Sequence, residues 1–236
     1  MAGILGIFAV PALIVIVVAY LMGSISFSII FTRIFDHHTD IRSMGSGNAG
    51  FTNVLRSVGA KAAIFTLIFD FAKCAASVEI GRYLFRYICT AHSLPAYYVQ
   101  YGAFLAGFAC VLGHIYPLYF GFRGGKGILS TSAMLAFLDW RIFIVAITIF
   151  VLLLVITKIV SISSICGAAS FPISNFIFAF LDYRSGYSYY GKLSFTYVWI
   201  TTVIAAIFAA ILIGKHRENI KRLRNGTEKK LSVKHK

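Results

Sequence analysis

Two cations stand among three glycines in "FRGGKG", at residues 122–127 of an otherwise apolar chain. Glycines let a backbone approach a ligand closely, while Arg123 and Lys126 supply positive charge. Beside a helix N-terminus, this combination suits the binding of phosphate. The run is not a Walker A loop, because the full G-x-x-x-x-G-K-[ST] spacing is absent and isoleucine follows the Lys-Gly pair. We therefore predict phosphate binding without ATP, with the backbone contributed by Gly124, Gly125 and Gly127.

A second polar cluster, the first loop, covers residues 40–59 with the sequence "DIRSMGSGNAGFTNVLRSVG". Its glycines allow tight turns, and its hydroxyl and amide side chains can hydrogen-bond a polar substrate. Arg56 offers a fork-shaped ligand for phosphate or carboxylate. The alternative is a flexible interfacial loop with solvated charges. The candidate binding residues here are Ser46, Asn48, Thr52, Asn53 and Arg56.

A third cluster, the basic tail, covers residues 214–236 and contains "GKHRENIKRLRNGTEKKL". His216 and Asn219 stand three residues apart, so that on a helix both would lie on one face and could address one substrate. Taken alone, such a tail more often anchors a protein to anionic headgroups, and a lone histidine is usually solvated. Both interpretations stay open for the tail by itself.

The composition of the chain indicates the kind of protein that carries these three clusters. Of the 236 residues, 59% are hydrophobic and 13% charged, which is typical of an integral membrane protein. The formal net charge of +14 is better explained by cytoplasmic loops near anionic lipid than by nucleic acid. The four cysteines have no CxxC spacing, so we expect neither a disulfide nor a zinc site.

Apolar runs predict an all-α polytopic protein with about seven transmembrane helices in a single domain, residues 1–236. The expected crossings are residues 5–31, 60–81, 96–120, 127–140, 141–157, 160–181 and 195–214. The fourth and fifth are short, so "DWR" would form a tight hairpin, and a six-crossing or re-entrant variant stays open between residues 127 and 157. The distribution of Lys and Arg places the N-terminus outside and the C-terminus in the cytoplasm. All three clusters then reach the cytoplasmic interface.

Polar residues within the apolar runs need partners. Asp70 and Lys73 are costly in lipid, so we expect them to face the bundle interior as a structural ion pair. His114 could tune a pocket or cap buried polar groups, and we favour the second role. His37 and His38 are adjacent and would point in different directions, so no metal site is predicted.

Three segments in this order resemble the PlsY family of bacterial acyl-phosphate:glycerol-3-phosphate acyltransferases: "GSGNAGFTNVLR", "GHIYPLYFGFRGGKG" and "HRENIKRLRNGTEKKL". We call the second, extended to residues 113–131, the glycine-rich loop. "GSISFS" and "FDFAK" are similar to two further family motifs, so the resemblance covers most of the chain. The chain departs from the family pattern at Ser26, Ser28, Phe51, Cys74 and Arg123.

The resemblance implies transfer of a fatty acyl group from acyl phosphate to the sn-1 hydroxyl of glycerol 3-phosphate. The products would be lysophosphatidic acid and phosphate, in the first acylation step of phospholipid biosynthesis. It also implies a multi-pass protein of the bacterial cytoplasmic (inner) membrane whose active site faces the cytoplasm. No cofactor and no metal are implied. We expect a monomer surrounded by membrane lipid, and a transient contact with the enzyme that makes acyl phosphate is a further candidate partnership.

By resemblance, the polar pocket would be formed by Ser46, Arg56, Lys126, His216 and Asn219. Arg56 and Lys126 would neutralise phosphate charge, and Asn219 could donate to the developing oxyanion. His216 could act as general base or orient glycerol 3-phosphate, and a substrate phosphate oxygen could instead take the hydroxyl proton. A covalent acyl-Ser46 is disfavoured, because the donor is already activated.

Two other classes of function could use the same basic loops. A transporter of a small phosphorylated anion would need its site near the bilayer midplane, whereas these clusters gather on one side. A scaffold that binds anionic lipid would depend on the basic tail alone.

Overall fold

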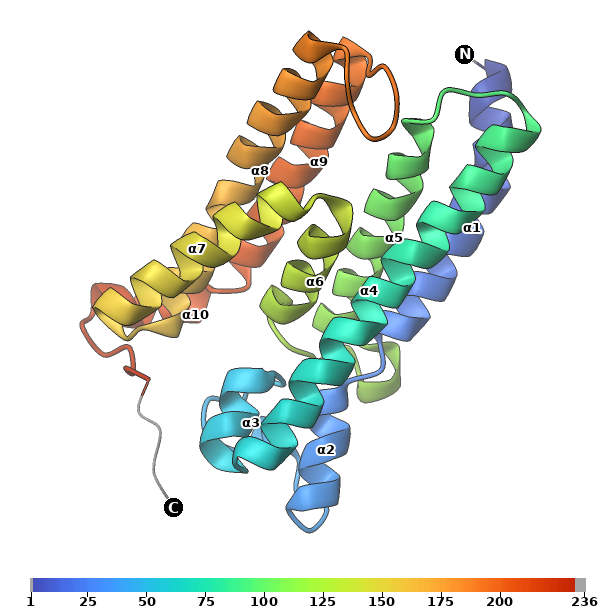
Figure 1. Ribbon diagram of the computed structural model, residues 1–236. Helices are drawn as coiled ribbons and strands as arrows, with labels where there is room; N and C mark the ends of the chain where they lie inside the picture. Colours follow the sequence, from blue (N-terminus) through green and yellow to red (C-terminus); the bar gives the residue numbers. More distant parts are fainter. Residues whose placement is uncertain (1, 232–236) are drawn as a thin grey trace. The chain divides into compact units, whose positions relative to one another are not determined.

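The computed structural model describes residues 2–231, and the last residues of the basic tail, 232–236, lie outside this range. The described chain is entirely helical and turn-like, with ten α-helices and two 3₁₀ turns (Figure 1). The elements are α1 (Ala2–Gly23), α2 (Phe27–Phe35), η1 (Ile41–Ser43), α3 (Phe51–Ser57), α4 (Ala60–Ala91), α5 (Tyr98–Ile115), η2 (Leu118–Phe120), α6 (Ile128–Leu138), α7 (Trp140–Thr157), α8 (Val160–Ser185), α9 (Phe195–Gly214) and α10 (Arg217–Arg224).

The chain forms two compact units, Met1–Leu138 and Asp139–Lys236. We call them the first and second unit. That both belong to one transmembrane domain stays a prediction.

Within residues 2–231, five segments are long and apolar enough to cross a membrane: Gly6–Phe35, Tyr98–Phe120, Trp140–Thr157, Val160–Ser185 and Phe195–Gly214. They match five of the seven predicted crossings. The other two predicted crossings, residues 60–81 and 127–140, are not among these five segments, for separate reasons. The predicted crossing at 60–81 lies within α4, which is long enough but interrupted by charges. α6 has 11 residues and extends only about 16 Å, against a bilayer core of about 30 Å. The orientation of the chain in the membrane stays a prediction.

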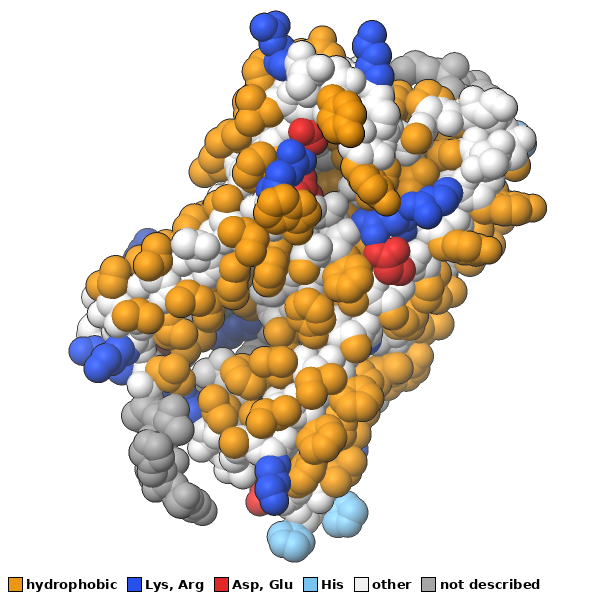
Figure 2. Space-filling view, in the orientation of Figure 1, with side chains coloured by type: hydrophobic (Ala, Val, Ile, Leu, Met, Phe, Trp, Pro, Cys, Tyr) orange, Lys and Arg blue, Asp and Glu red, His pale blue; other side chains and the backbone are white. Residues whose placement is uncertain are grey.

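Hydrophobic side chains line the flanks of the helices that are visible in Figure 2. Several of the most exposed belong to predicted crossings, including Val155 and Ile156 of α7, at 70% and 76% exposure. Such exposure would be unfavourable in water and is the expected state of a side chain facing lipid.

The first crossing, predicted as one run over residues 5–31, is broken between α1 and α2. Lys73 of α4 holds the break: its Nζ donates to the carbonyls of Gly23, at 3.0 Å, and Ile25, at 2.6 Å. The same Nζ lies 2.7 Å from Oδ1 of Asp70, which confirms the predicted ion pair. His114 Nδ1 lies 3.3 Å from Lys73 Nζ, so His114 caps this buried group as expected. The lysine charge is therefore satisfied by the carbonyls that the helix break leaves unpaired.

Glycines bring α5 against its neighbours in the first unit. A Cβ at Gly23 would overlap the backbone of Cys110, and one at Gly113 would meet the carbonyl of Tyr20. α4 and α5 approach equally closely, because a Cβ at Gly81 would collide with the backbone of Gly102. Small residues permit such backbone contact between membrane helices. α1, α4 and α5 accordingly lie alongside one another in Figure 1.

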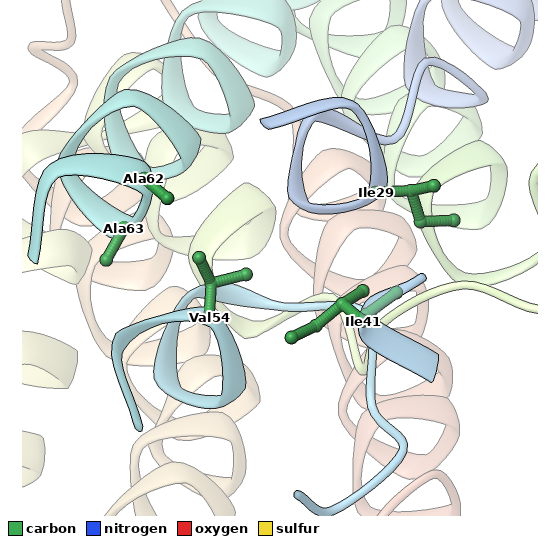
Figure 3. Packing of buried hydrophobic residues seen from close by; sticks show 6 residues of the cluster. Ile29, Ile41, Val54, Ala62 and Ala63 are labelled. Carbon is green, nitrogen blue, oxygen red and sulfur yellow. The ribbon is translucent and has the colours of Figure 1, made fainter. Parts of the chain in front are cut away.

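The first loop is anchored by an apolar cluster (Figure 3). Ile41 and Val54 from the loop, both fully buried, pack with Ile29 of α2 and with Ala62 and Ala63 of α4. Burying a branched side chain of this size stabilises a fold by about 1.5–3 kcal/mol. The first loop is thus fixed to α2 and α4 by its buried apolar side chains.

In the second unit, a partly exposed ion cluster joins the start of α7 to the end of α8. Asp139 caps α7 by accepting from the N–H of Arg141. The Arg141 guanidinium contacts both Asp139 and Asp182, donating to the two oxygens of Asp182 at 2.9 and 2.7 Å. α8 and α9 are linked further along by Asn175, which donates to Thr201 at 3.2 Å.

Candidate active site

Asn53 organises the tip of the first loop. Its amide nitrogen donates to the carbonyls of Ile41, at 3.2 Å, and Met44, at 2.9 Å. Its amide oxygen accepts from the N–H of Ser46, at 3.0 Å. The side chain is buried, so its polar atoms serve the loop itself. Asn53, predicted to bind substrate, therefore holds Ser46 in place, and Ser46 remains exposed at the tip.

The second half of the first loop is the helix α3, where sequence analysis expected an irregular loop. Thr52 lies in its first turn and Arg56 in its last. Arg56 is exposed, while Thr52 and Asn48 are half-buried. Gly45 has φ +58°, a left-handed conformation in which any side chain would also collide with Asn53.

The glycine-rich loop closes onto the end of α5. The N–H of Gly124 donates to the carbonyl of Ile115 and that of Gly125 to the carbonyl of His114, each at 3.2 Å. These are C-terminal carbonyls of a helix, which need partners. The prediction that these two N–H groups cradle a phosphate therefore needs revision, because both already have acceptors. The two hydrogen bonds fix the backbone directly before Lys126, which is half-buried.

Gly125 is also where the glycine-rich loop meets the first loop. A Cβ at this position would overlap Nε2 of His114 on one side and the carbonyl of Ala49 on the other. Gly127 adopts φ +83°, which only glycine adopts easily, immediately before α6. The glycines thus allow two polar loops and α5 to meet within van der Waals distance.

Arg42 joins the same two loops through polar contacts, and sequence analysis did not select it. Its guanidinium contacts Asp40 in the first loop and the carbonyls of Phe120 and Arg123 in the glycine-rich loop. The spacing Asp-x-Arg, with the first residue able to cap a turn, was the available signal. Arg123 itself is exposed.

His216 begins α10 directly after the last apolar segment, in the N-cap position. Its side chain is 2% exposed, and its Nδ1 lies 2.8 Å from the carbonyl of Leu212. Because a carbonyl oxygen only accepts, Nδ1 carries the hydrogen and the neutral ring keeps its lone pair on Nε2. This is the tautomer that a general base acting through Nε2 requires.

Glu228 is the hub of the basic tail and was not selected from the sequence. Its Oε1 accepts from Asn219, at 2.6 Å, and from Ser161 of α8, at 2.8 Å. Its Oε2 accepts from Nε of Arg222, at 2.6 Å. Burial on its own would raise the pKa of Glu228, but these three donors hold that pKa below its usual value. A carboxylate therefore fixes the Asn219 amide, and the spacing of nine residues gave no hint of the contact.

The predicted site residues divide between the two units. Ser46, Arg56 and Lys126 belong to the first unit, whereas His216 and Asn219 belong to the second. Their assembly into one pocket stays a prediction. Among residues 2–231, no group of three or more His, Cys, Asp or Glu side chains is placed to hold a metal ion.

A family model described as glycerol-3-phosphate acyltransferase matches residues 13–226, which include all three polar clusters except the end of the tail. The chain belongs to the glycerol-3-phosphate acyltransferase (PlsY) family. The resemblance predicted from the three motifs is therefore confirmed.

Relatives in this family match this chain over nearly its whole length. The glycerol-3-phosphate acyltransferase of Thermoanaerobacter sp. (strain X514) is 37% identical over 226 residues, covering 94% of this chain and 97% of the relative. That of Mycoplasmopsis synoviae (strain 53) is 36% identical over 223 residues, covering 92% and 93%.

The solved structure of an integral membrane glycerol 3-phosphate acyltransferase, PlsY (YgiH), in its glycerol 3-phosphate form, is similar with TM-score 0.70 and 29% identity. The matched region covers 94% of this chain and 96% of the PlsY (YgiH) chain. The lysophosphatidic acid form of PlsY (YgiH) gives TM-score 0.69 and 28% identity. This protein is accordingly an integral membrane acyltransferase of glycerol 3-phosphate that serves phospholipid biosynthesis.

Proposed function

We propose that this acyltransferase takes its acyl group from acyl phosphate and transfers it to the sn-1 hydroxyl of glycerol 3-phosphate, releasing lysophosphatidic acid and inorganic phosphate. The observation that carries the proposal is the direct joining of two cation-bearing loops in the first unit, through Gly125 and Arg42. Two phosphate-bearing substrates need more cationic ligands than one, and the joined loops offer Arg56, Arg123 and Lys126. A donor that is itself a phosphate suits such a surface.

The reaction forms one ester bond and breaks one acyl–phosphate bond. The glycerol hydroxyl oxygen attacks the acyl carbonyl carbon, and the bond from that carbon to the phosphate oxygen breaks, so that phosphate leaves with the electron pair. The hydroxyl proton passes to Nε2 of His216, the ring nitrogen that accepts in the tautomer set by Leu212. A phosphate oxygen of the donor is the competing acceptor for this proton.

The remaining side chains bind and orient the two substrates. Arg56 and Lys126 neutralise phosphate charge, and Ser46 hydrogen-bonds substrate from the loop tip that Asn53 fixes. Asn219 donates to the oxygen that becomes negative during attack, with its amide oriented by Glu228. Asn48, Thr52 and Arg123 complete the substrate contacts.

The proposed location is the bacterial cytoplasmic membrane, with the three clusters on the cytoplasmic side. Glycerol 3-phosphate then arrives from water, and the lipid product leaves sideways into the bilayer. We propose a monomer that uses no cofactor and meets the acyl-phosphate-producing enzyme only transiently.

The test is phosphate release by detergent-purified protein given palmitoyl phosphate and glycerol 3-phosphate, without CoA or metal. Lys126→Ala and His216→Ala are compared with Lys192→Ala, a matched removal of an exposed cation outside the three clusters. We expect release only with both substrates, lysophosphatidic acid as product, and a loss of at least about 100-fold in both site variants.

Palmitoyl-CoA serves as the competing donor in a parallel reaction. Acylation from the thioester but not from acyl phosphate would refute the proposed donor while leaving the family assignment intact. Equal activity in Lys126→Ala and Lys192→Ala would refute the proposed role of the glycine-rich loop.

A further inference from the structure

Asp40 holds the guanidinium of Arg42 in one orientation. Nε of Arg42 donates to Oδ1 at 3.0 Å and Nη2 donates to Oδ2 at 2.8 Å, a two-point contact between planar groups. The backbone N–H of Arg42 also donates to Oδ1 at 2.9 Å, so Asp40 caps the turn η1 at the same time. The Arg42 side-chain hydrogen bond lowers the pKa of Asp40, because it favours the ionised carboxylate.

The other end of the guanidinium, Nη1, reaches the glycine-rich loop. It donates to the carbonyl of Phe120 at 2.7 Å and to that of Arg123 at 3.3 Å. These two carbonyls flank Gly121 and Phe122, which both have left-handed backbone, with φ +66° and +59°. A non-glycine residue rarely adopts this conformation and needs surrounding contacts to keep it.

The segment next to this turn has little freedom of its own. Past Arg123, the N–H groups of Gly124 and Gly125 are bonded to the end of α5. Within the turn, the N–H of Phe122 donates to the carbonyl of Pro117, at 2.9 Å. The left-handed turn therefore has a contact of its own, and Arg42 adds one contact on each side of it.

We propose that Arg42 is a positioning residue of the transferase site: by bridging Asp40 to both sides of the left-handed turn, it fixes where Arg123 stands for a phosphate-bearing substrate. The inference rests on the proposed function, because Arg123 is assigned to substrate there. Arg42 acts through the loop and touches neither reacting group.

The test compares Arg42→Lys with Arg33→Gln in steady-state acyl transfer. Lysine keeps the charge but cannot contact a carboxylate at two points and two carbonyls together. Arg33 also approaches Asp40, at 3.6 Å, and has no contact with the glycine-rich loop among the described residues, so it is the matched control. We expect Arg42→Lys to raise KM for a phosphate-bearing substrate about tenfold with kcat within about twofold, and Arg33→Gln to leave both unchanged.

Measuring KM for each substrate at saturating levels of the other identifies which phosphate the turn serves. A rise for acyl phosphate alone assigns Arg123 to the donor, and a rise for glycerol 3-phosphate alone assigns it to the acceptor. Either result supports the positioning role.

A second substitution separates positioning from general stability. Asn adopts left-handed backbone more readily than Phe, and Phe122 is exposed, so Phe122→Asn should be tolerated. We expect Phe122→Asn in the Arg42→Lys background to lower the raised KM by at least about threefold. Unchanged KM in Arg42→Lys, with kcat and thermal stability falling together, would overturn the inference but not the proposed function. An inactive wild-type protein would instead remove the proposed function on which it rests.

Discussion

The buried pair of Asp70 and Lys73 allows a quantitative test of how the helix break is held. Asp70 is 1% exposed and Lys73 is 6% exposed, so neither charge can be satisfied by water. Lys73→Met would take the ammonium away from the Asp70 carboxylate, which keeps only the longer contact to His114 Nδ1, 3.7 Å from Oδ1, and would also release the carbonyls of Gly23 and Ile25. Removing one partner of a buried ion pair costs about 3–5 kcal/mol of unfolding free energy.

Asp70→Asn should cost less, because Lys73 keeps both carbonyl acceptors. We expect about 1–3 kcal/mol, the penalty for a weakened hydrogen bond to a charged group. The double variant has no unpaired charge and loses mainly the two carbonyl contacts, at about 0.5–1.5 kcal/mol each. It should therefore be more stable than Lys73→Met alone, with a coupling free energy of about 2 kcal/mol or more.

The assay is equilibrium unfolding in mixtures of SDS and mild detergent, followed by circular dichroism. Ser77→Ala is the matched control, since Ser77 is buried on the same helix and donates to its own backbone, at the Lys73 carbonyl. We expect Ser77→Ala to change the free energy of unfolding by less than about 1 kcal/mol. Costs that simply add in the double variant, or a larger cost for Asp70→Asn than for Lys73→Met, would refute the reasoning.

Three further substitutions test features of the two units. Gly125→Ala places a methyl group against the His114 ring and a backbone carbonyl. We therefore expect acyl transfer to fall about tenfold or more, while the circular dichroism spectrum stays helical. Full activity would contradict the close contact. The depressed pKa of Glu228 means that its stabilising contribution is complete above about pH 4.5 and is lost as pH falls through the lower folded-state pKa. Glu228→Gln should therefore lower thermal stability at pH 7 and differ less from wild type in acid, as unfolding at both pH values would reveal. Arg141→Lys gives up the two-point contact in a partly exposed cluster and should cost about 1–2 kcal/mol in the same unfolding assay, whereas no cost would show that the cluster is dispensable.

Hydrophobic patterning predicted most of the fold because lipid-facing helices need long apolar runs. Five crossings were found this way, and Asp70 with Lys73 was identified as an interior pair because charge is costly in lipid. The break after Gly23 was missed, since the apolar run continues through it. The carbonyls at the break are bonded to Lys73, 50 residues beyond Gly23, and hydropathy carries no information about such a contact.

The sequence suggested candidate residues for the site but did not reveal what several of them do in the fold. Glycines and cations singled out two loops that meet at Gly125, yet the N–H groups of Gly124 and Gly125 cap α5. Asn53 likewise holds the loop, although an amide there is equally able to bind substrate. The Asp-x-Arg spacing signalled only the local pair of Asp40 and Arg42, whereas the contact of Arg42 to the glycine-rich loop and that of Glu228 to Ser161 arise only on folding.

The close glycine contacts of α5 also have a consequence for the folding of this chain while it is being synthesised. α5 supplies the close partner for a glycine of α1, Gly23, and for a glycine of α4, Gly81. A nascent chain that has delivered only α1 and α4 to the membrane lacks both of these contacts. The first unit can therefore complete its packing only once residues up to Ile115 have left the ribosome. A pause in synthesis before Tyr98 would leave α1 and α4 in the membrane without the contacts that α5 provides.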